Sequence, residues 1–247
     1  MSIPKIIHYC WLGNNPKSKL IEKCIASWRE KLPDYKIVEW SESNFDINNH
    51  AFMSEAYKIG KFAFSSDQLR YLVLSKYGGI FLDCDVEVLR SMDSLLDNEL
   101  FLGLEEHVGN KFVVNPGLVI GCEPNNWLIN KMVAKYESCR FLDEFNNPNM
   151  SLSSPFLLTT ELLKYGYQNN NVEQDLEGKI KIYPTSFFDP IDHKSFRQNL
   201  KGNWREAYTI HWGAGSWLGR NAKYRRYFSL IVRKIFGNRI IDIIRRK

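Results

Sequence analysis

Two carboxylates lie one residue apart in the stretch KYGGIFLDCDVEVLR, residues 76–90. Asp83 and Asp85 follow the apolar residues 80–82, which we expect to form a buried strand. An isolated carboxylate is costly to remove from water, so two acids at this place need a partner. On an extended backbone both side chains point to the same side, where they repel each other unless they share a cation. Carboxylate oxygens suit Mg²⁺ or Mn²⁺, and Mg²⁺ commonly bridges carboxylates and substrate phosphates. The spacing therefore predicts a divalent-ion site that could hold a diphosphate.

A second interpretation is that the acid pair marks an ordinary turn that ends a β-hairpin. The segment before it favours the functional interpretation. Ser65 and Gln68 fit a capping box, which predicts the start of a helix that ends at Gly78. Asp67 and Arg70 are three residues apart and therefore share one face of this helix. A helix that carries a charged pair and leads directly into the acidic stretch indicates a ligand-binding site rather than an ordinary turn.

The elements that must position these residues follow an α/β pattern. Residues 5–12 and 35–40 are rich in β-branched and aromatic residues, and apolar residues at helical spacing lie between them. This order predicts a βαβ unit. Later strands are expected within 99–106, 112–123, 179–184 and 207–213, and later helices within 125–139 and 154–166. We therefore expect one α/β domain over residues 1–219 and a separate tail over residues 220–247.

The composition limits the class of protein. The chain has 247 residues, 44% of them hydrophobic, which is enough to bury one large core. Its five cysteines are odd in number and form no CxxC pair, which argues against a disulfide framework or a zinc site and favours a reducing compartment. The N-terminal stretch lacks the features of a signal peptide. No apolar run approaches the roughly 20 residues that a membrane-spanning helix needs.

Three stretches carry a resemblance to a known family: IPKIIHYCWLG (3–13), FSSDQLRYLVLSKYGGIFLDCDVEVL (64–89) and IHWGAGSW (210–217). They resemble the sugar-transferase region of glycosyltransferase family 32 and are similar to the catalytic domain of the large clostridial glucosylating toxins. The resemblance implies a GT-A fold, in which a Rossmann-like mixed sheet is flanked by helices. It also implies a nucleotide-sugar donor, usually UDP-linked, a Mn²⁺ or Mg²⁺ cofactor, and retention of the anomeric configuration.

The same resemblance implies roles for the residues in these stretches. Asp85 matches a direct metal ligand, and Asp83 matches a residue that contacts the donor ribose and assists with the ion. Asp67 and Arg70 match the helix pair that holds the donor sugar and the diphosphate; with the two acids they form the expected catalytic group. Trp11 matches an aromatic residue that stacks on the uracil.

Further positions complete the expected site. Asn115 falls in a segment that lines the sugar pocket in relatives. A late His often completes the metal site of a GT-A fold, and neutral imidazole is a good ligand, so His211 is expected as a metal ligand or diphosphate contact. Ser216 and Trp217, in a glycine-containing stretch, are expected to close over a phosphate. Phe81 stands where relatives often have Tyr, so the hydroxyl contact of those relatives is expected to be absent.

The tail is strongly basic. Residues 220–247 carry a net charge of +9, whereas the rest of the chain carries −4. Apolar residues recur at helical spacing among the Arg and Lys residues, which predicts a basic amphipathic helix on an anionic membrane surface. The alternative is a helix that packs on the domain with a solvated basic face. No nucleic-acid partner is expected, because such a protein would carry basic charge across its domain.

The leading hypothesis is a retaining hexosyltransferase of bacterial capsule or O-antigen (lipopolysaccharide) synthesis. We expect it to be cytoplasmic and peripheral on the inner face of the membrane, beside a glycan acceptor linked to undecaprenyl diphosphate. One alternative is a glucosylating effector that acts on a protein. Another is a phosphatase or phosphotransferase of the haloacid-dehalogenase type, whose strand-end DxD motif requires Thr or Val where Glu87 stands. A non-catalytic module that binds sugar nucleotides or lipids is the third; it would bind without metal and without turnover.

Overall fold

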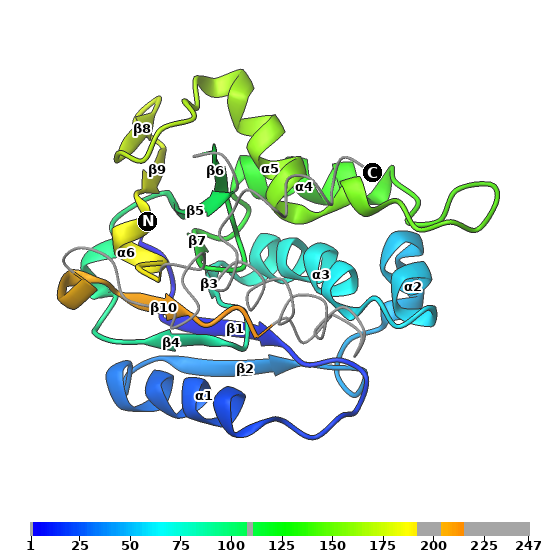
Figure 1. Cartoon of the computed structure of the whole chain (residues 1–247), viewed down its shortest axis with the longest axis horizontal. Helices are drawn as coiled ribbons and strands as arrows, with labels where there is room; N and C mark the ends of the chain where they lie inside the picture. Colours follow the sequence, from blue (N-terminus) through cyan, green and yellow to red (C-terminus); the bar gives the residue numbers. More distant parts are fainter. Residues whose placement is uncertain (1, 108–110, 192–203, 215–247) are drawn as a thin grey trace, which may run out of the picture.

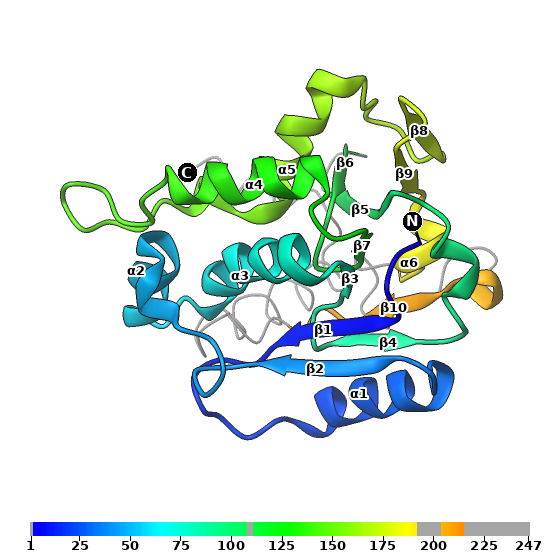
Figure 2. The same ribbon diagram turned by 180° about the vertical axis from the view of Figure 1, so that it is seen from behind.

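The computed structural model describes residues 2–107, 111–191 and 204–214. Within them the chain forms a mixed α/β fold with a central sheet and helices on both of its faces (Figures 1 and 2). The central strands lie in the order β2-β1-β3-β7-β5-β9-β8, and β6 pairs with β5. Their bounds are β1 Ile6–Cys10, β2 Lys36–Trp40, β3 Gly79–Phe81, β5 Leu100–His107, β6 Lys111–Val114, β7 Ile120–Cys122, β8 Gln174–Leu176 and β9 Ile180–Tyr183. A separate antiparallel pair consists of β4 Val86–Val88 and β10 Thr209–His211.

The helices divide between the two faces of the sheet. Their bounds are α1 Lys19–Lys31, α2 Ala51–Lys58, α3 Phe62–Tyr77, α4 Trp127–Glu137, α5 Ser154–Leu162 and α6 Thr185–Phe188. Short 3₁₀ turns lie at Ile47–Asn49, Asp93–Leu95, Met150–Leu152, Leu163–Tyr165 and Trp204–Glu206. Helix α3 packs against β1, β3 and the neighbouring helices α2, α4 and α5, whereas α1 contacts β4. The expectation of a helix-flanked mixed sheet over the main domain is confirmed.

Side-chain alternation along the central strands builds a core on each face. Phe81 joins the core under α2–α5, whereas its neighbours Ile80 and Leu82 join the core beside α1 and β4. All three side chains are fully buried. A strand buried on both faces has no polar side chain until it ends, so the acids appear directly after β3. The strand thus fixes where the polar site begins.

The N-terminal βαβ unit is confirmed. Strands β1 and β2 are parallel, with Ile6 opposite Lys36 and Cys10 opposite Trp40. Ser18 is the N-cap of α1. The parallel pair brings the carboxyl ends of β1, β2 and β3 to one edge of the sheet.

Two local features differ from the sequence prediction. The capping box was wrong, because α3 already begins at Phe62. Ser65 and Gln68 lie inside the helix, where the Ser65 hydroxyl donates to Met53 O and Gln68 Oε1 accepts from Met53 N, each over 3.0 Å. These two polar residues therefore fasten α3 to α2, a helix that the sequence analysis did not predict. Strand β8 was also missed.

The tail remains outside this description. Residues 215–247 are not among the described residues, so the boundary between residues 1–219 and 220–247 stays a prediction. Within the described part of the chain, no helix is both long and apolar enough to cross a membrane.

Candidate active site

Asp83 and Asp85 lie in a tight turn that connects the central sheet to the β4–β10 pair. The expected extended backbone was wrong: Val86 N donates to Asp83 O over 3.0 Å and closes the turn. The hairpin alternative is also wrong, because β3 pairs with β1 and β7, whereas β4 pairs with β10. The turn follows the carboxyl end of β3, the edge at which α/β sheets bind ligands.

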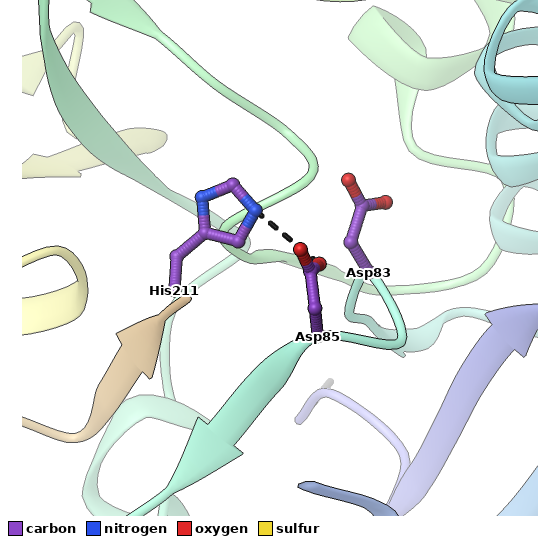
Figure 3. Close-up of side chains that lie close together, drawn as sticks. All are labelled: Asp83, Asp85 and His211. Atoms are coloured by element: carbon purple, nitrogen blue, oxygen red, sulfur yellow. Dashed lines mark ion pairs between the residues drawn. The ribbon is translucent and has the colours of Figure 1, made fainter. Parts of the chain in front are cut away.

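His211 approaches the two acids from β10. The β10–β4 register places His211 opposite Val86, the residue after Asp85. His211 Nε2 lies 3.3 Å from Asp85 Oδ1, as the dashed line in Figure 3 marks. One potential ligand atom from each of Asp83, Asp85 and His211 lies within 4.8 Å of the other two. The structure thus brings together the three residues that were expected to hold a metal.

Asp85 also holds the backbone that follows β10. Trp212 N donates to Asp85 O over 3.1 Å, and Ala214 N donates to Asp85 Oδ2 over 2.7 Å. The aspartate therefore connects the turn after β3 to the segment that leads toward residue 215.

His211 and Asp85 shift each other's pKa in opposite directions. Burial lowers the pKa of His211, but the charge of Asp85 and its hydrogen bond outweigh that effect and raise the pKa to about 10. Burial likewise opposes ionisation of Asp85, yet the His211 charge holds the pKa of this carboxyl at about 2. Without a metal, the pair is therefore an imidazolium and a carboxylate at neutral pH.

The donor set fits a divalent ion. Two carboxylates and one imidazole converge from a turn and a neighbouring strand, a combination suited to Mn²⁺ or Mg²⁺ with remaining positions for phosphate oxygens. A histidine must be neutral to bind a metal, so binding of the ion through His211 would release its proton.

Arg70 connects Asp83 to α3. Its Nη2 lies 3.2 Å from Asp83 Oδ1 and 3.1 Å from Asp67 Oδ1. Asp67 Oδ2 accepts from Ser154 N over 3.0 Å, and the guanidinium lies 5.0 Å from the centre of the Phe81 ring. Arg70 is 3% exposed, and its Nη1 has no hydrogen-bond partner within the described residues. In this structure Arg70 and Asp67 lie directly behind Asp83 and hold it.

Burial disfavours the charged forms of both Arg70 and Asp67. Burial lowers the pKa of Arg70, but the charges of Asp83 and Asp67 raise it by more than burial lowers it. The guanidinium therefore stays charged. Burial raises the pKa of Asp67 to about 6, although Arg70 and the Ser154 N–H favour the ionised form. At neutral pH one buried cation therefore faces two carboxylates, which reduces the repulsion between Asp83 and its neighbours.

Asn115 is connected to the same turn through Gly117. It lies in the loop between β6 and β7, where its Oδ1 accepts from Gly117 N over 2.8 Å. Gly117 O in turn accepts from Asp83 N over 2.9 Å. A Cβ atom on Gly117 would lie 2.3 Å from Asp83 Oδ2, so only glycine leaves room for the aspartate.

Glu105 is a residue of this region that the sequence analysis did not single out. Asn115 Nδ2 donates to Glu105 Oε2 over 2.7 Å. The available signal was the alternation of β5, which places Phe101, Gly103 and Glu105 on one face of the strand. Phe101 joins the core beside β4, so Glu105 is the first charged residue on that face.

The remaining expected residues have different outcomes. Trp11 is half-buried after β1; its Nε1 donates to Asn15 O over 2.8 Å, and Lys17 Nζ lies 5.3 Å from its ring centre. Its stacking on a base stays a prediction. Ser216 and Trp217 lie outside the described residues.

Comparison with known proteins supports this view of the site. Residues 18–102 match the family model described as a glycosyltransferase sugar-binding region containing DXD motif, and Asp83-Cys84-Asp85 lies within the match. Mannosyl phosphorylinositol ceramide synthase CSH1 of Saccharomyces cerevisiae is 30% identical over 202 residues, covering 78% of this chain and 49% of that protein. Inositol phosphoceramide mannosyltransferase 1 of Schizosaccharomyces pombe is 24% identical over 242 residues, covering 90% of this chain and 64% of that protein. The chain thus spans less than two thirds of the length of either relative.

The fold has a solved counterpart. The structure described as PaToxG Glycosyltransferase superposes with a TM-score of 0.52 at 22% identity, over 66% of this chain and 70% of that one. The family match confirms the resemblance to family 32 that residues 64–89 carry; the other two motif stretches lie outside the matched residues. Residues 18–102 therefore resemble a glycosyltransferase sugar-binding region with a DXD motif, and the chain has a mixed α/β fold of the GT-A type.

Proposed function

We propose that the protein is a metal-dependent, retaining glycosyltransferase that takes a sugar from a nucleotide-sugar donor, most simply a UDP-sugar. The observation that carries the proposal is the convergence of Asp83 and Asp85, inside the DXD region, with His211 from β10. These groups come from two different strand ends and lie at the sheet edge where ligands bind. Such a donor set suits a cation and a diphosphate better than a neutral ligand.

The side chains divide the work by their charge and position. Asp83, Asp85 and His211 would hold Mn²⁺ or Mg²⁺, which when bound supplies positive charge to the diphosphate leaving group. Arg70 adds a permanent positive charge behind Asp83 and keeps that carboxylate in place. We place Trp11 against the base and Asn115 beside the sugar. Retention follows in this proposal from departure and attack on one face of the sugar, with the leaving diphosphate accepting the proton of the acceptor hydroxyl.

The acceptor that we propose is a glycan on a lipid carrier, undecaprenyl diphosphate, in the synthesis of a bacterial capsule or O-antigen. The basic residues 220–247 would hold the enzyme on the anionic inner face of the membrane. The names of the two yeast relatives favour a second candidate acceptor, the head group of inositol phosphoceramide, with mannose as the sugar. Both candidates place a hydroxylated head group at a membrane surface.

The experiment that tests the proposal is a panel of UDP- and GDP-linked sugars, including mannose, in the presence of Mn²⁺. Sugar-donor binding and slow hydrolysis are measured first, then transfer to undecaprenyl-diphosphate-linked glycans and to inositol phosphoceramide. We expect one nucleotide sugar to bind and hydrolyse, and chelation of the metal to stop both. Cleavage of simple phosphate esters without any response to nucleotide sugars would refute the transferase and favour the phosphatase alternative.

A further inference from the structure

Glu105 stands at the end of a continuous chain of hydrogen bonds that begins at the DXD turn. Asp83 N donates to Gly117 O, Gly117 N donates to Asn115 Oδ1, and Asn115 Nδ2 donates to Glu105 Oε2. The three bonds are 2.9, 2.8 and 2.7 Å long. The carboxylate of Glu105 is therefore fixed relative to Asp83 by rigid backbone and a single amide side chain.

The side chain of Glu105 faces the site. Phe101, Gly103 and Glu105 share one face of β5, and Gly103 closely approaches Phe188. Phe188 O accepts from Thr209 Oγ1 on β10, two residues before His211. The same face of β5 that carries Glu105 therefore packs against α6, which in turn hydrogen-bonds to β10, the strand that presents the histidine.

The local charges agree with this placement. Burial opposes ionisation of Glu105, but the hydrogen bond from His107 and then the positive charge of His211 lower its pKa. The charge of Glu105 in turn helps to raise the pKa of His211. Glu105 is thus ionised at neutral pH, close enough to His211 for each charge to affect the other.

One oxygen of the Glu105 carboxylate, Oε1, can accept a further hydrogen bond. Oε2 accepts from Asn115 and lies 3.5 Å from His107 Nε2. Within the described residues Oε1 makes no hydrogen bond or ion pair, and the side chain is 22% exposed. A fixed, partly exposed carboxylate oxygen accepts strong hydrogen bonds from hydroxyl groups, because its charge assists each bond. By contrast, Asp67 uses one oxygen for Arg70 and the other for Ser154 N.

We propose that Glu105 contacts the sugar that is transferred, with Oε1 accepting a hydrogen bond from a sugar hydroxyl and Asn115 orienting the carboxylate. The inference rests on the proposed function, because the sugar must hang from a diphosphate held at the DXD turn. It makes Glu105 a residue that selects the sugar: a sugar that places a hydroxyl at Oε1 is preferred over its deoxy counterpart.

The test compares two ligands of the intact protein with Mn²⁺: the free nucleoside diphosphate and the nucleotide sugar that the panel identifies. Glu105→Ala should weaken binding of the nucleotide sugar about tenfold or more and leave binding of the diphosphate unchanged. Glu105→Gln keeps an oxygen that can accept from the hydroxyl but loses the charge, so it should bind the sugar ligand with intermediate strength and show a reduced preference for the natural sugar over a deoxy analogue. The matched control is Glu106→Ala, since alternation places that side chain on the other face of β5.

Three outcomes would overturn the inference. Equal weakening of both ligands would show that Glu105 acts only through the position of Asp83. Unchanged affinity for both ligands, with lost transfer to the acceptor, would place Glu105 at the acceptor instead. Unchanged binding, turnover and deoxy discrimination would remove it from the site. If no nucleotide binds the wild-type protein at all, the proposed function itself fails, which is a separate result.

Discussion

Arg70 and Asp83 are joined through one guanidinium nitrogen, Nη2, at 3.2 Å from Asp83 Oδ1. The same nitrogen contacts Asp67 Oδ1 at 3.1 Å, whereas Nη1 has no hydrogen-bond partner among the described residues. The position of one carboxylate of the candidate metal site therefore depends on a buried residue of α3. Within the described residues the guanidinium also retains an unused donor group, Nη1.

Replacing Arg70 should separate its structural and binding contributions. Arg70→Met leaves Asp67 buried without its cation, which should lower the free energy of unfolding by roughly 3–5 kcal/mol. Addition of Asp67→Asn should recover part of this loss, because the unpaired charge is then gone. Urea denaturation of the two single variants and the double variant measures the coupling. Strictly additive losses would contradict a direct charge pair.

Arg70→Lys provides the matching test of binding. Lysine keeps the charge but presents a single ammonium point instead of a planar fork. We expect a smaller loss of stability than for Arg70→Met and a loss of about tenfold or more in Mn²⁺-dependent nucleotide affinity, measured by calorimetry.

Gly117 should be needed for binding more than for folding. In Gly117→Ala the new Cβ would lie 2.3 Å from Asp83 Oδ2, so the partly exposed aspartate must move. We expect metal and nucleotide affinity to fall tenfold or more while the melting temperature changes little. Gly178→Ala is the control, since its Cβ meets open space and its φ of +67° makes the substitution strained. That variant should lose about 1 kcal/mol of stability and keep its affinity. The reverse pattern would show that Gly117 only maintains the fold.

The sequence predicted the parts of this site that local pattern determines. The apolar run before Asp83 identified a buried strand, and the pattern of residues 5–40 identified the N-terminal βαβ unit. The backbone of the acid pair could not be predicted, because the turn exists only where β4 leaves the central sheet to pair with β10. The approach of His211 to Asp85 depends on the same long-range pairing.

Tertiary contacts explain the other differences. Ser65 and Gln68 look like a helix cap in sequence, yet their partner is Met53 in a helix that packs alongside. Helix α2 has only eight residues, which is too few for its apolar spacing to stand out. Glu105 could not be recognised from the sequence, because its link to the site is a hydrogen bond from Asn115, which lies after the neighbouring strand β6.

Metal affinity should rise with pH. With a pKa of about 10 in the metal-free protein, His211 must lose a proton to become a ligand. We expect Mn²⁺ affinity to increase about tenfold per pH unit between roughly pH 7 and 9, and about one proton to be released on binding. Calorimetry in buffers of different ionisation enthalpy measures the proton count. Affinity that is independent of pH in this range would exclude His211 as a ligand.

The buried His8 should make the fold sensitive to acid. Nε2 of His8 donates to Gly78 O, and Nδ1 accepts from the Trp40 indole; protonation of Nδ1 would remove the second bond, which requires the neutral ring. Burial lowers its pKa from 6.5 to about 4. A depressed pKa gives stability that is complete above pH 6.5 and is lost as the pH falls toward 4, about 2 kcal/mol of it by pH 5.

The variant His8→Gln isolates this effect, since glutamine can donate and accept at similar positions but does not titrate. The stability lost between pH 8 and pH 5 should be about 2 kcal/mol larger for the wild-type protein than for the variant. Equal acid sensitivity of the two proteins in urea denaturation would show that His8 is not the titrating group.

The most direct test of the metal-dependent site is the effect of Mn²⁺ on UDP binding by the wild-type protein and by Asp85→Asn. The asparagine keeps the size of the side chain and an oxygen that can accept from Ala214 N, but removes the charge beside His211. Asp97→Asn, at an exposed position, serves as the control. We expect Mn²⁺ to strengthen UDP binding more than tenfold in the wild-type and control proteins and to have no effect in Asp85→Asn, which remains folded. An undiminished Mn²⁺ effect in folded Asp85→Asn would contradict the assignment of the site.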